Sequence, residues 1–92
     1  MLKIEYTLQF KRDYKLAVKR GCNPQKLQNV VTLLCEEKTL PQKYRDHMLV
    51  NSRNYKDMRE CHIEPDWLLI YKIEHDTLIL RMIRTGTHSD LF

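Results

Sequence analysis

The sequence predicts an α+β fold in which two helices pack on one face of a small, mostly antiparallel sheet. Three observations support this: helical periodicity fills the first half of the chain, strand-like segments gather in the second half, and only short turns separate the late strands. Strands joined by tight turns pair antiparallel, so the expected order is β-α-α-β-β-β. The chain has 92 residues, 42% hydrophobic and 30% charged, which indicates one globular domain over residues 1–92.

The first strand and the first helix follow directly from the N-terminus. Charged and larger side chains alternate over residues 3–7, as in a short strand. From Thr7, a suitable N-cap, to Arg20 the period becomes helical, with Phe10 on an apolar face and basic side chains on the others. Gly21 is expected to end this helix.

A second helix is expected to start where Asn23 precedes Pro24, because Asn caps free amides and Pro tolerates the first turn. Its apolar stripe is the clearest in the chain and consists of Leu27, Val30, Val31, Leu34 and Cys35. The helix is expected to end near Lys38. Residues 42–54 are polar and irregular, which predicts a connecting loop that contains His47.

The second half of the chain reads as three strands. Residues 55–63 form the first, and residues 64–66 form a turn because Pro65 fixes its own φ and pushes its neighbour toward an extended conformation. Residues 67–72 contain five apolar side chains without alternation, as a central strand covered on both faces would. The pair His75-Asp76 is expected to be a hairpin turn before a last strand at 77–83.

A polar cluster adjoins this central strand. Because residues 64–66 are expected to be a turn between two strands, His62 and Asp66 are expected to face each other across the hairpin. The sheet face opposite the helices, the loop around His47 and the C-terminal tail would then form a concave surface, where a functional site is expected.

The charge of the chain favours an anionic partner. Sixteen Lys and Arg against twelve Asp and Glu give a net charge of +4, which suits RNA, DNA or an acidic protein segment, although a solvated surface explains it equally. Residues that can contact RNA backbone collectively are Lys11, Arg12, Lys15, Lys19, Lys43, Arg45, Arg53 and Lys56.

Three cysteines, Cys22, Cys35 and Cys61, form an odd set without Cys-x-x-Cys spacing, which favours reduced thiols in a cytosolic setting. The first residues lack a basic region followed by an apolar run, and no stretch reaches the length of a membrane span. The sequence therefore predicts a soluble, unexported protein.

Three ordered motifs carry a resemblance to a known family. They are the segment Tyr44–His47, the block Arg59–Trp67 with its apolar continuation to Tyr71, and the ending Arg84–Phe92. The chain resembles the YafQ-type toxins of the RelE superfamily, which belong to bacterial type II toxin–antitoxin systems. The resemblance implies a RelE-like fold and an endoribonuclease that cuts messenger RNA in the ribosomal decoding site, without a metal or other cofactor.

The resemblance also implies catalytic positions at His47, His62, Asp66 and His88. Cleavage of this type needs a base for the ribose 2′-OH, stabilisation of the charged transition state, and an acid for the leaving oxygen; histidine suits both proton roles near neutrality. We hypothesise that His88 is the acid, His47 or Asp66 the base, and His62 a phosphate or orienting contact.

Four further residues are candidates for substrate binding. Arg84 would stabilise the transition-state charge, and Arg81 would contact phosphate. Strict alternation places Arg84 on the core face of its strand, so either that face reaches the cleft or a bulge changes the register. Trp67 fits packing better than base stacking, whereas Phe92 at the chain end is expected to position RNA.

The alternative function is a nonenzymatic RNA-binding module, because a basic, aromatic-containing sheet binds nucleic acid without catalysis. A metalloenzyme is disfavoured because the sequence lacks ligand spacing, and His75 is expected to be structural. The resemblance implies a cytoplasmic bacterial protein with mRNA, the ribosome and a DinJ- or RelB-like antitoxin as partners. Operator DNA would be contacted only through the antitoxin, and no membrane is involved.

Overall fold

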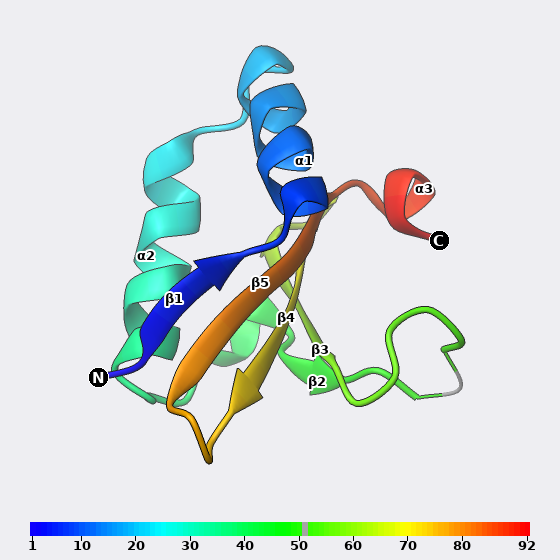
Figure 1. Cartoon of the computed structure of the whole chain (residues 1–92). Coiled ribbons are helices and arrows are strands. Elements are labelled where there is room, and N and C mark those ends of the chain that lie inside the picture. The colour runs from blue at the N-terminus through cyan, green and yellow to red at the C-terminus, as the bar shows by residue number, and fades with distance from the viewer. Residues whose placement is uncertain (51) are drawn as a thin grey trace.

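A five-stranded sheet in the order β1-β5-β4-β3-β2 organises the molecule, which we describe from a computed structural model covering residues 1–50 and 52–92 (Figure 1). The elements are β1 (Lys3–Tyr6), α1 (Leu8–Lys19), α2 (Pro24–Cys35), the 3-10 turn η1 (Gln42–Tyr44), β2 (His47–Met48), β3 (Arg59–Glu64), β4 (Trp67–Glu74), β5 (Ile79–Gly86) and α3 (His88–Leu91). β1 pairs with β5 in parallel, and the other three pairings are antiparallel. The predicted α+β fold class is confirmed.

Both long helices begin at the predicted caps. The Thr7 side chain accepts a hydrogen bond from the Phe10 amide at 2.9 Å, and Asn23 accepts one from the Gln25 amide at 3.0 Å. Gly21 has φ +95° directly after the first helix, as its role of stop requires. The second helix ends at Cys35 and not near Lys38, because Glu37 adopts a left-handed conformation (φ 57°) that reverses the chain.

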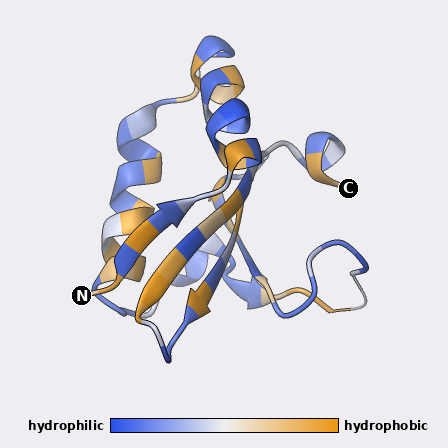
Figure 2. Ribbon diagram, viewed as in Figure 1, coloured by the Kyte–Doolittle hydropathy of each residue, from blue (hydrophilic) through white to orange (hydrophobic). Residues whose placement is uncertain are grey.

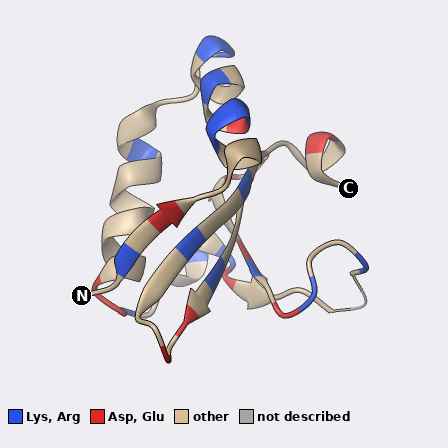
Figure 3. Ribbon diagram, viewed as in Figure 1, with Lys and Arg blue, Asp and Glu red and all other residues tan. Residues whose placement is uncertain are grey.

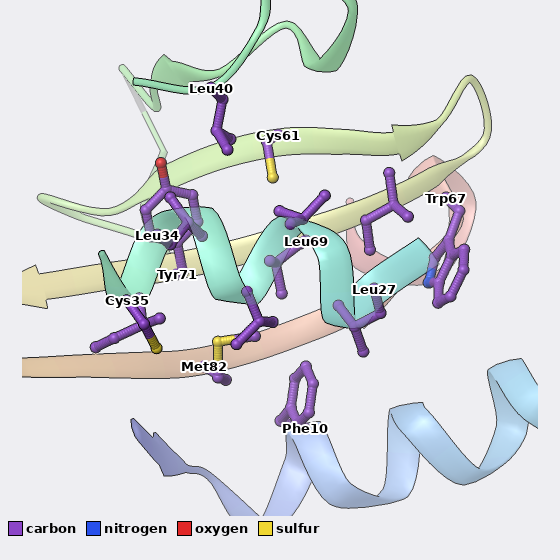
Figure 4. Close-up of a cluster of buried hydrophobic side chains, with 14 of the residues drawn as sticks. Phe10, Leu27, Leu34, Cys35, Leu40, Cys61, Trp67, Leu69, Tyr71 and Met82 are labelled. Carbon is purple, nitrogen blue, oxygen red and sulfur yellow. The ribbon is translucent and has the colours of Figure 1, made fainter. Parts of the chain in front are cut away.

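β4 is the central strand, as predicted, and it separates two apolar clusters. Trp67, Leu69 and Tyr71 join the main core beneath the helices (Figure 4). Leu68 and Ile70 project to the other face, where Tyr55 and Leu91 cover them. Figure 2 shows the hydrophobic residues of the sheet in orange along its strands. The face opposite the helices is partly covered by the loop before β3 and by α3, so it is less open than predicted.

Three short elements were not predicted from the sequence. The expected loop 42–54 contains η1 and the two-residue strand β2; within that loop, Asn51 lies outside the described residues. The C-terminal tail forms α3, where Thr87 and Asp90 make a reciprocal capping box. All three elements are too short to show a hydrophobic period.

The ends of two strands also differ from the prediction. β3 starts at Arg59 and not at residue 55, because the Met58 amide bonds the Tyr55 carbonyl in a turn with Asp57 at φ 62°. β5 starts at Ile79, because the left-handed Leu78 (φ 56°) belongs to the hairpin turn, and it continues to Gly86.

A bulge in β5 determines on which face of the sheet the Arg84 side chain lies. Ile70 pairs with Arg84 and Tyr71 pairs with Met82, so Ile83 is an extra residue on β5. The extra residue places Met82 in the main core and Arg84 opposite Ile70 on the other face. The bulge alternative is therefore confirmed.

No helix in the described ranges 1–50 and 52–92 is long and apolar enough to cross a membrane. Cys35 and Cys61 are buried, and Cys22 is partly exposed. Burial raises the pKa of all three thiols, with the acid side chains nearby adding to the effect.

We expect iodoacetamide at pH 8 to modify Cys22 first, because Cys22 is the most accessible of the three thiols and burial raises the pKa of Cys61 furthest. Cys35 and Cys61 should react only when the chain is unfolded. Peptide mass spectrometry with and without denaturant measures this, and native-state labelling of Cys61 as fast as that of Cys22 would contradict the burial described.

Candidate active site

Strand pairing arranges the candidate residues in two rows on the face opposite the helices. One row runs across four strands as His47, Glu60, Ile70 and Arg84, each paired with the next. Directly paired residues share a face, and three strand spacings separate the ends of this row by roughly 14 Å. The neighbouring row contains His62, Leu68 and Gly86, after which α3 begins.

Two histidines converge on one carboxylate. Glu60 Oε1 lies 3.4 Å from His62 Nε2 and 3.7 Å from His47 Nε2. The Glu60 side chain is only 8% exposed, whereas His47 is 50% exposed. His47 therefore presents a reactive ring to solvent while its charge partner lies beneath it.

The position of His47 is set by the residues just before it. Arg45 adopts a left-handed conformation (φ 48°), and its carbonyl oxygen lies 2.7 Å from His47 Nδ1. Asp46 is bound by Arg59 Nη2 at 3.0 Å and by the Tyr71 hydroxyl. Burial, and then the hydrogen bond to Asp46, raises the pKa of Tyr71, so this hydroxyl remains a donor. The loop that carries His47 is thus fixed to β3 and β4.

An ion pair with the buried Asp13 holds the partly buried Arg84. Its Nε and Nη2 atoms donate to Asp13 at 3.0 and 2.9 Å, and the Thr85 amide donates to the same carboxylate at 3.2 Å. The hydrogen bonds with Asp13 raise the pKa of Arg84 despite its partial burial. The guanidinium keeps 25% of its side-chain surface exposed, which leaves it able to face an anion.

Several contacts hold α3 against the sheet. Arg20, the residue that follows α1, binds Asp90 at 2.7 Å, and the Tyr55 hydroxyl donates to the Leu91 carbonyl at 2.8 Å. Hydrogen bonds from Thr87, and then from Arg20, lower the pKa of Asp90 to about 2. A depressed carboxyl pKa stabilises the fold above the unfolded value of about 4, and this contribution disappears as the pH falls toward 2. α3 is therefore anchored throughout the physiological range.

His88 and Phe92 project from α3 toward solvent. Their ring centroids are 4.9 Å apart, and Tyr55 contacts Phe92 edge-on at 5.4 Å. Phe92 is 51% exposed, so it does not complete the core. This exposure fits the role expected of it.

The expectation that His62 faces Asp66 is wrong. A register shift after His62 pairs Glu64 with Trp67, and His62 itself pairs with Leu68. Asp66 borders a cavity of about 250 Å³ between α1, β5 and α3, together with Arg84 and Asp90. His62 borders a different cavity of about 560 Å³, whose other lining residues are Lys26, Asn29, Lys43, Tyr44, Arg45, Ile63, Glu64 and Pro65.

Trp67 and Arg81 are less available for binding RNA than the other candidate residues. Trp67 is 4% exposed, and its indole N–H donates to the Thr85 hydroxyl at 2.9 Å, as a packing residue would. Arg81 binds Glu5 and Glu74 at 3.0 and 3.1 Å, and the hydrogen bond with Glu74 raises its pKa. Its charge is already balanced within the sheet.

Three residues of the site were missed from the sequence. Glu60 could have been found because it alternates with His62 on one strand face. Asp13 sits three residues after Phe10 and four before Ala17, so it is an acid on an apolar helix face. Tyr55 gave no such signal. Among the residues that the structure describes, no group of three His, Cys, Asp or Glu side chains is arranged to hold a metal ion.

Solved structures with the same fold define the class of protein. A metal-bound toxin from Helicobacter pylori superposes with a TM-score of 0.93 at 43% identity, with both chains covered completely. The Escherichia coli DinJ–YafQ complex contains a chain that superposes with a TM-score of 0.87 at 46% identity, covering 100% of this chain and 99% of that one. The fold is that of a small bacterial toxin.

Sequence comparison gives the family. The family model described as "Bacterial toxin of type II toxin-antitoxin system, YafQ" matches residues 2–92. The chain is 48% identical over 90 residues to the mRNA interferase toxin YafQ of E. coli strain B, covering 97% of this chain and 94% of the relative. It is also 36% identical over 93 residues to a YafQ-type toxin of Haemophilus influenzae, covering 96% and 89%. The chain belongs to the YafQ family of type II toxins.

Proposed function

We propose that this toxin is an endoribonuclease that cuts messenger RNA and thereby inhibits translation. The observation that carries the proposal is the row of His47, Glu60 and Arg84 across one sheet face, with His88 beyond its neighbouring row. In this proposal His47 is the base, Arg84 the cation and His88 the acid, and the side chains of His47 and His88 are exposed. The E. coli relatives are named mRNA interferase toxins, in agreement with the proposal.

In the proposed reaction, His47 Nε2 takes the proton of a ribose 2′-OH, and the oxygen attacks the adjacent phosphorus. The bond from phosphorus to the 5′-oxygen breaks, and His88 donates a proton to that oxygen. The products are a 2′,3′-cyclic phosphate and a 5′-hydroxyl. Arg84, which Asp13 holds in place, stabilises the charge on the phosphoryl oxygens.

His47 is the better base than Asp66 on geometric grounds. His47 lies beside Glu60 and His62, whereas Asp66, which is also exposed, lies elsewhere, at the cavity that Arg84 and Asp90 line. We therefore assign the base to His47 and an orienting contact to His62. Phe92 stacks on a base next to the cleaved bond, which its half-exposed ring permits.

Basic residues along α1 provide a path for the RNA backbone or for ribosomal RNA. Lys11, Arg12, Lys15 and Lys19 lie on this helix, and Figure 3 shows its blue segments above the sheet. Phosphate contacts of this kind position nucleic acid without reading its sequence. We propose that they seat the toxin in the decoding site of the ribosome.

An antitoxin is the proposed protein partner. A YafQ toxin of E. coli forms a complex with DinJ, and we propose that a DinJ- or RelB-like protein inhibits this chain in the bacterial cytoplasm. Operator DNA would be bound through that antitoxin. An acidic segment on the antitoxin would associate rapidly with a chain of net charge +4.

The proposal is tested by adding the purified toxin to a cell-free bacterial translation reaction and mapping messenger 5′ ends by primer extension. Parallel reactions omit ribosomes or contain the His88→Ala variant. Cuts at a fixed codon position that need both ribosomes and His88 support the proposal. RNA binding without cleavage would replace it with the nonenzymatic module.

Deleting Phe92 is expected to lower the cleavage rate roughly 5- to 150-fold, which corresponds to the free energy of stacking one base on an aromatic ring. The melting temperature should fall by only about a few degrees. The reason is that the ring is half exposed. The matched control is Leu91→Ala, which removes the buried anchor of α3 and should lower both quantities. Equal losses of cleavage and stability in the Phe92 deletion would show that the ring serves packing.

A further inference from the structure

Glu60 is a nearly buried carboxylate whose ion-pair partners among the described residues are His47 and His62. Its side chain is 8% exposed, and the same oxygen, Oε1, faces both rings. Burying a carboxylate is costly unless partners compensate it. The position therefore calls for a role connected with the two histidines.

Hydrogen bonds on the far side of each ring fix which nitrogen faces Glu60. His47 Nδ1 lies 2.7 Å from the Arg45 carbonyl, and His62 Nδ1 lies 3.3 Å from the Pro65 carbonyl. A carbonyl oxygen only accepts, so each Nδ1 carries a proton and donates it. In a neutral ring Nε2 then has a lone pair, and it is this nitrogen that lies within 3.4 to 3.7 Å of the carboxylate.

The lone pair of a neutral Nε2 is not attracted to the Glu60 carboxylate. Once Nε2 has received a proton, the ring is positively charged and the carboxylate attracts it strongly. The site is thus complementary to the imidazolium that forms when the ring takes the ribose proton, and less so to the neutral ring before reaction. An interaction that strengthens as charge develops lowers the barrier. The 3.4 and 3.7 Å distances leave room for this contact to shorten.

We propose that Glu60 is the positioning residue of this active site: it stabilises the imidazolium formed during proton abstraction, and its one oxygen holds a protonated Nε2 of either histidine in place. This inference rests on the proposed ribonuclease function. Glu60 itself takes no proton from the substrate. The proton passes from the ribose oxygen to His47 Nε2, and Glu60 supplies the compensating charge.

The test compares Glu60→Gln, Glu60→Asp and the control Glu36→Gln in the ribosome-dependent cleavage assay. Gln keeps the shape of Glu60 but lacks its charge, so kcat should fall roughly 10- to 100-fold with KM changed less than about 2-fold. Asp retains the charge and should recover part of kcat. Glu36 lies after α2 and pairs with Lys38, so its neutralisation should leave kcat unchanged.

A second readout does not depend on activity. Long-range ¹⁵N NMR of the free toxin reports which ring nitrogen carries the proton. Glu60→Gln should move the ring signals of His62, whose carbonyl contact is long, more than those of His47. Melting temperatures identify any variant that does not fold. If Glu60→Gln does not fold, Glu60→Asp still tests the inference, because its shorter side chain lengthens both Nε2 contacts and should lower kcat relative to wild type and move the ring signals.

The outcomes separate this inference from the proposed function. A wild-type protein that cuts no RNA refutes the ribonuclease proposal, while the ring signals still test whether Glu60 orients the histidines. If wild type is active and Glu60→Gln keeps its kcat, the positioning role is refuted. A reduced kcat with unchanged ring signals in both histidines also refutes it, whereas changes in both support it.

Discussion

Replacing His88 with alanine is expected to lower the rate of mRNA cleavage by at least about 10²–10⁴-fold, because the leaving 5′-oxygen loses its proton donor. The folded structure should persist, since α3 is held by Asp90 and Leu91 and the His88 side chain is exposed. The measurement is the initial cleavage rate in the ribosome-dependent assay, together with the melting temperature.

His75→Asn is the matched control for this variant. His75 is also an exposed histidine, but it lies in the turn between β4 and β5, at the other end of β5 from Gly86. Its replacement should leave the cleavage rate unchanged. A His88→Ala protein that cuts as fast as the His75→Asn protein would remove His88 from the mechanism.

Asp13→Asn is expected to give the largest loss of stability, about 2–4 kcal/mol in the free energy of unfolding. The change leaves the partly buried guanidinium of Arg84 without its counter-charge and weakens the acceptor for the Thr85 amide. For a domain of this size the loss corresponds to a fall of roughly 10–25 °C in melting temperature. Thermal and urea unfolding measure both quantities.

The control for Asp13 is Glu64→Gln, which breaks an exposed pair with Lys26 at 3.1 Å. Exposed pairs contribute little, so the expected loss is below about 1 kcal/mol. Similar losses in the two variants would mean that burial of the Asp13–Arg84 pair has no special effect on stability.

The main features of the fold could be predicted because they rest on repeated local signals. The apolar stripe of α2 and the unbroken apolar run of β4 each extend over several residues, so no single side chain decides them. Capping by Thr7 and Asn23 is local chemistry and was predicted correctly. Turn positions were less accurate, because left-handed residues such as Glu37 and Leu78 are not glycines and give no signal in the sequence.

The candidate site was predicted less completely, because its geometry depends on pairings between distant strands. A single bulge at Ile83 decides which face Arg84 occupies, and alternation alone left two alternatives. A register shift after His62 separates it from Asp66, which adjacency to Pro65 could not reveal. Glu60 and Asp13 resemble ordinary surface acids until the partners that bury them are known.

The parallel pairing of β1 with β5 has a consequence for biosynthesis. Lys3 meets Ile79, and Thr7 bonds the backbone of Met82 and Ile83, so the first segment of the chain finds its partners only after nearly all of it has been made. Contacts between such distant segments form late and slowly. His88 and Phe92 are synthesised later still. We expect a nascent chain to remain catalytically silent until it leaves the ribosome that produced it, which protects that ribosome from its own product.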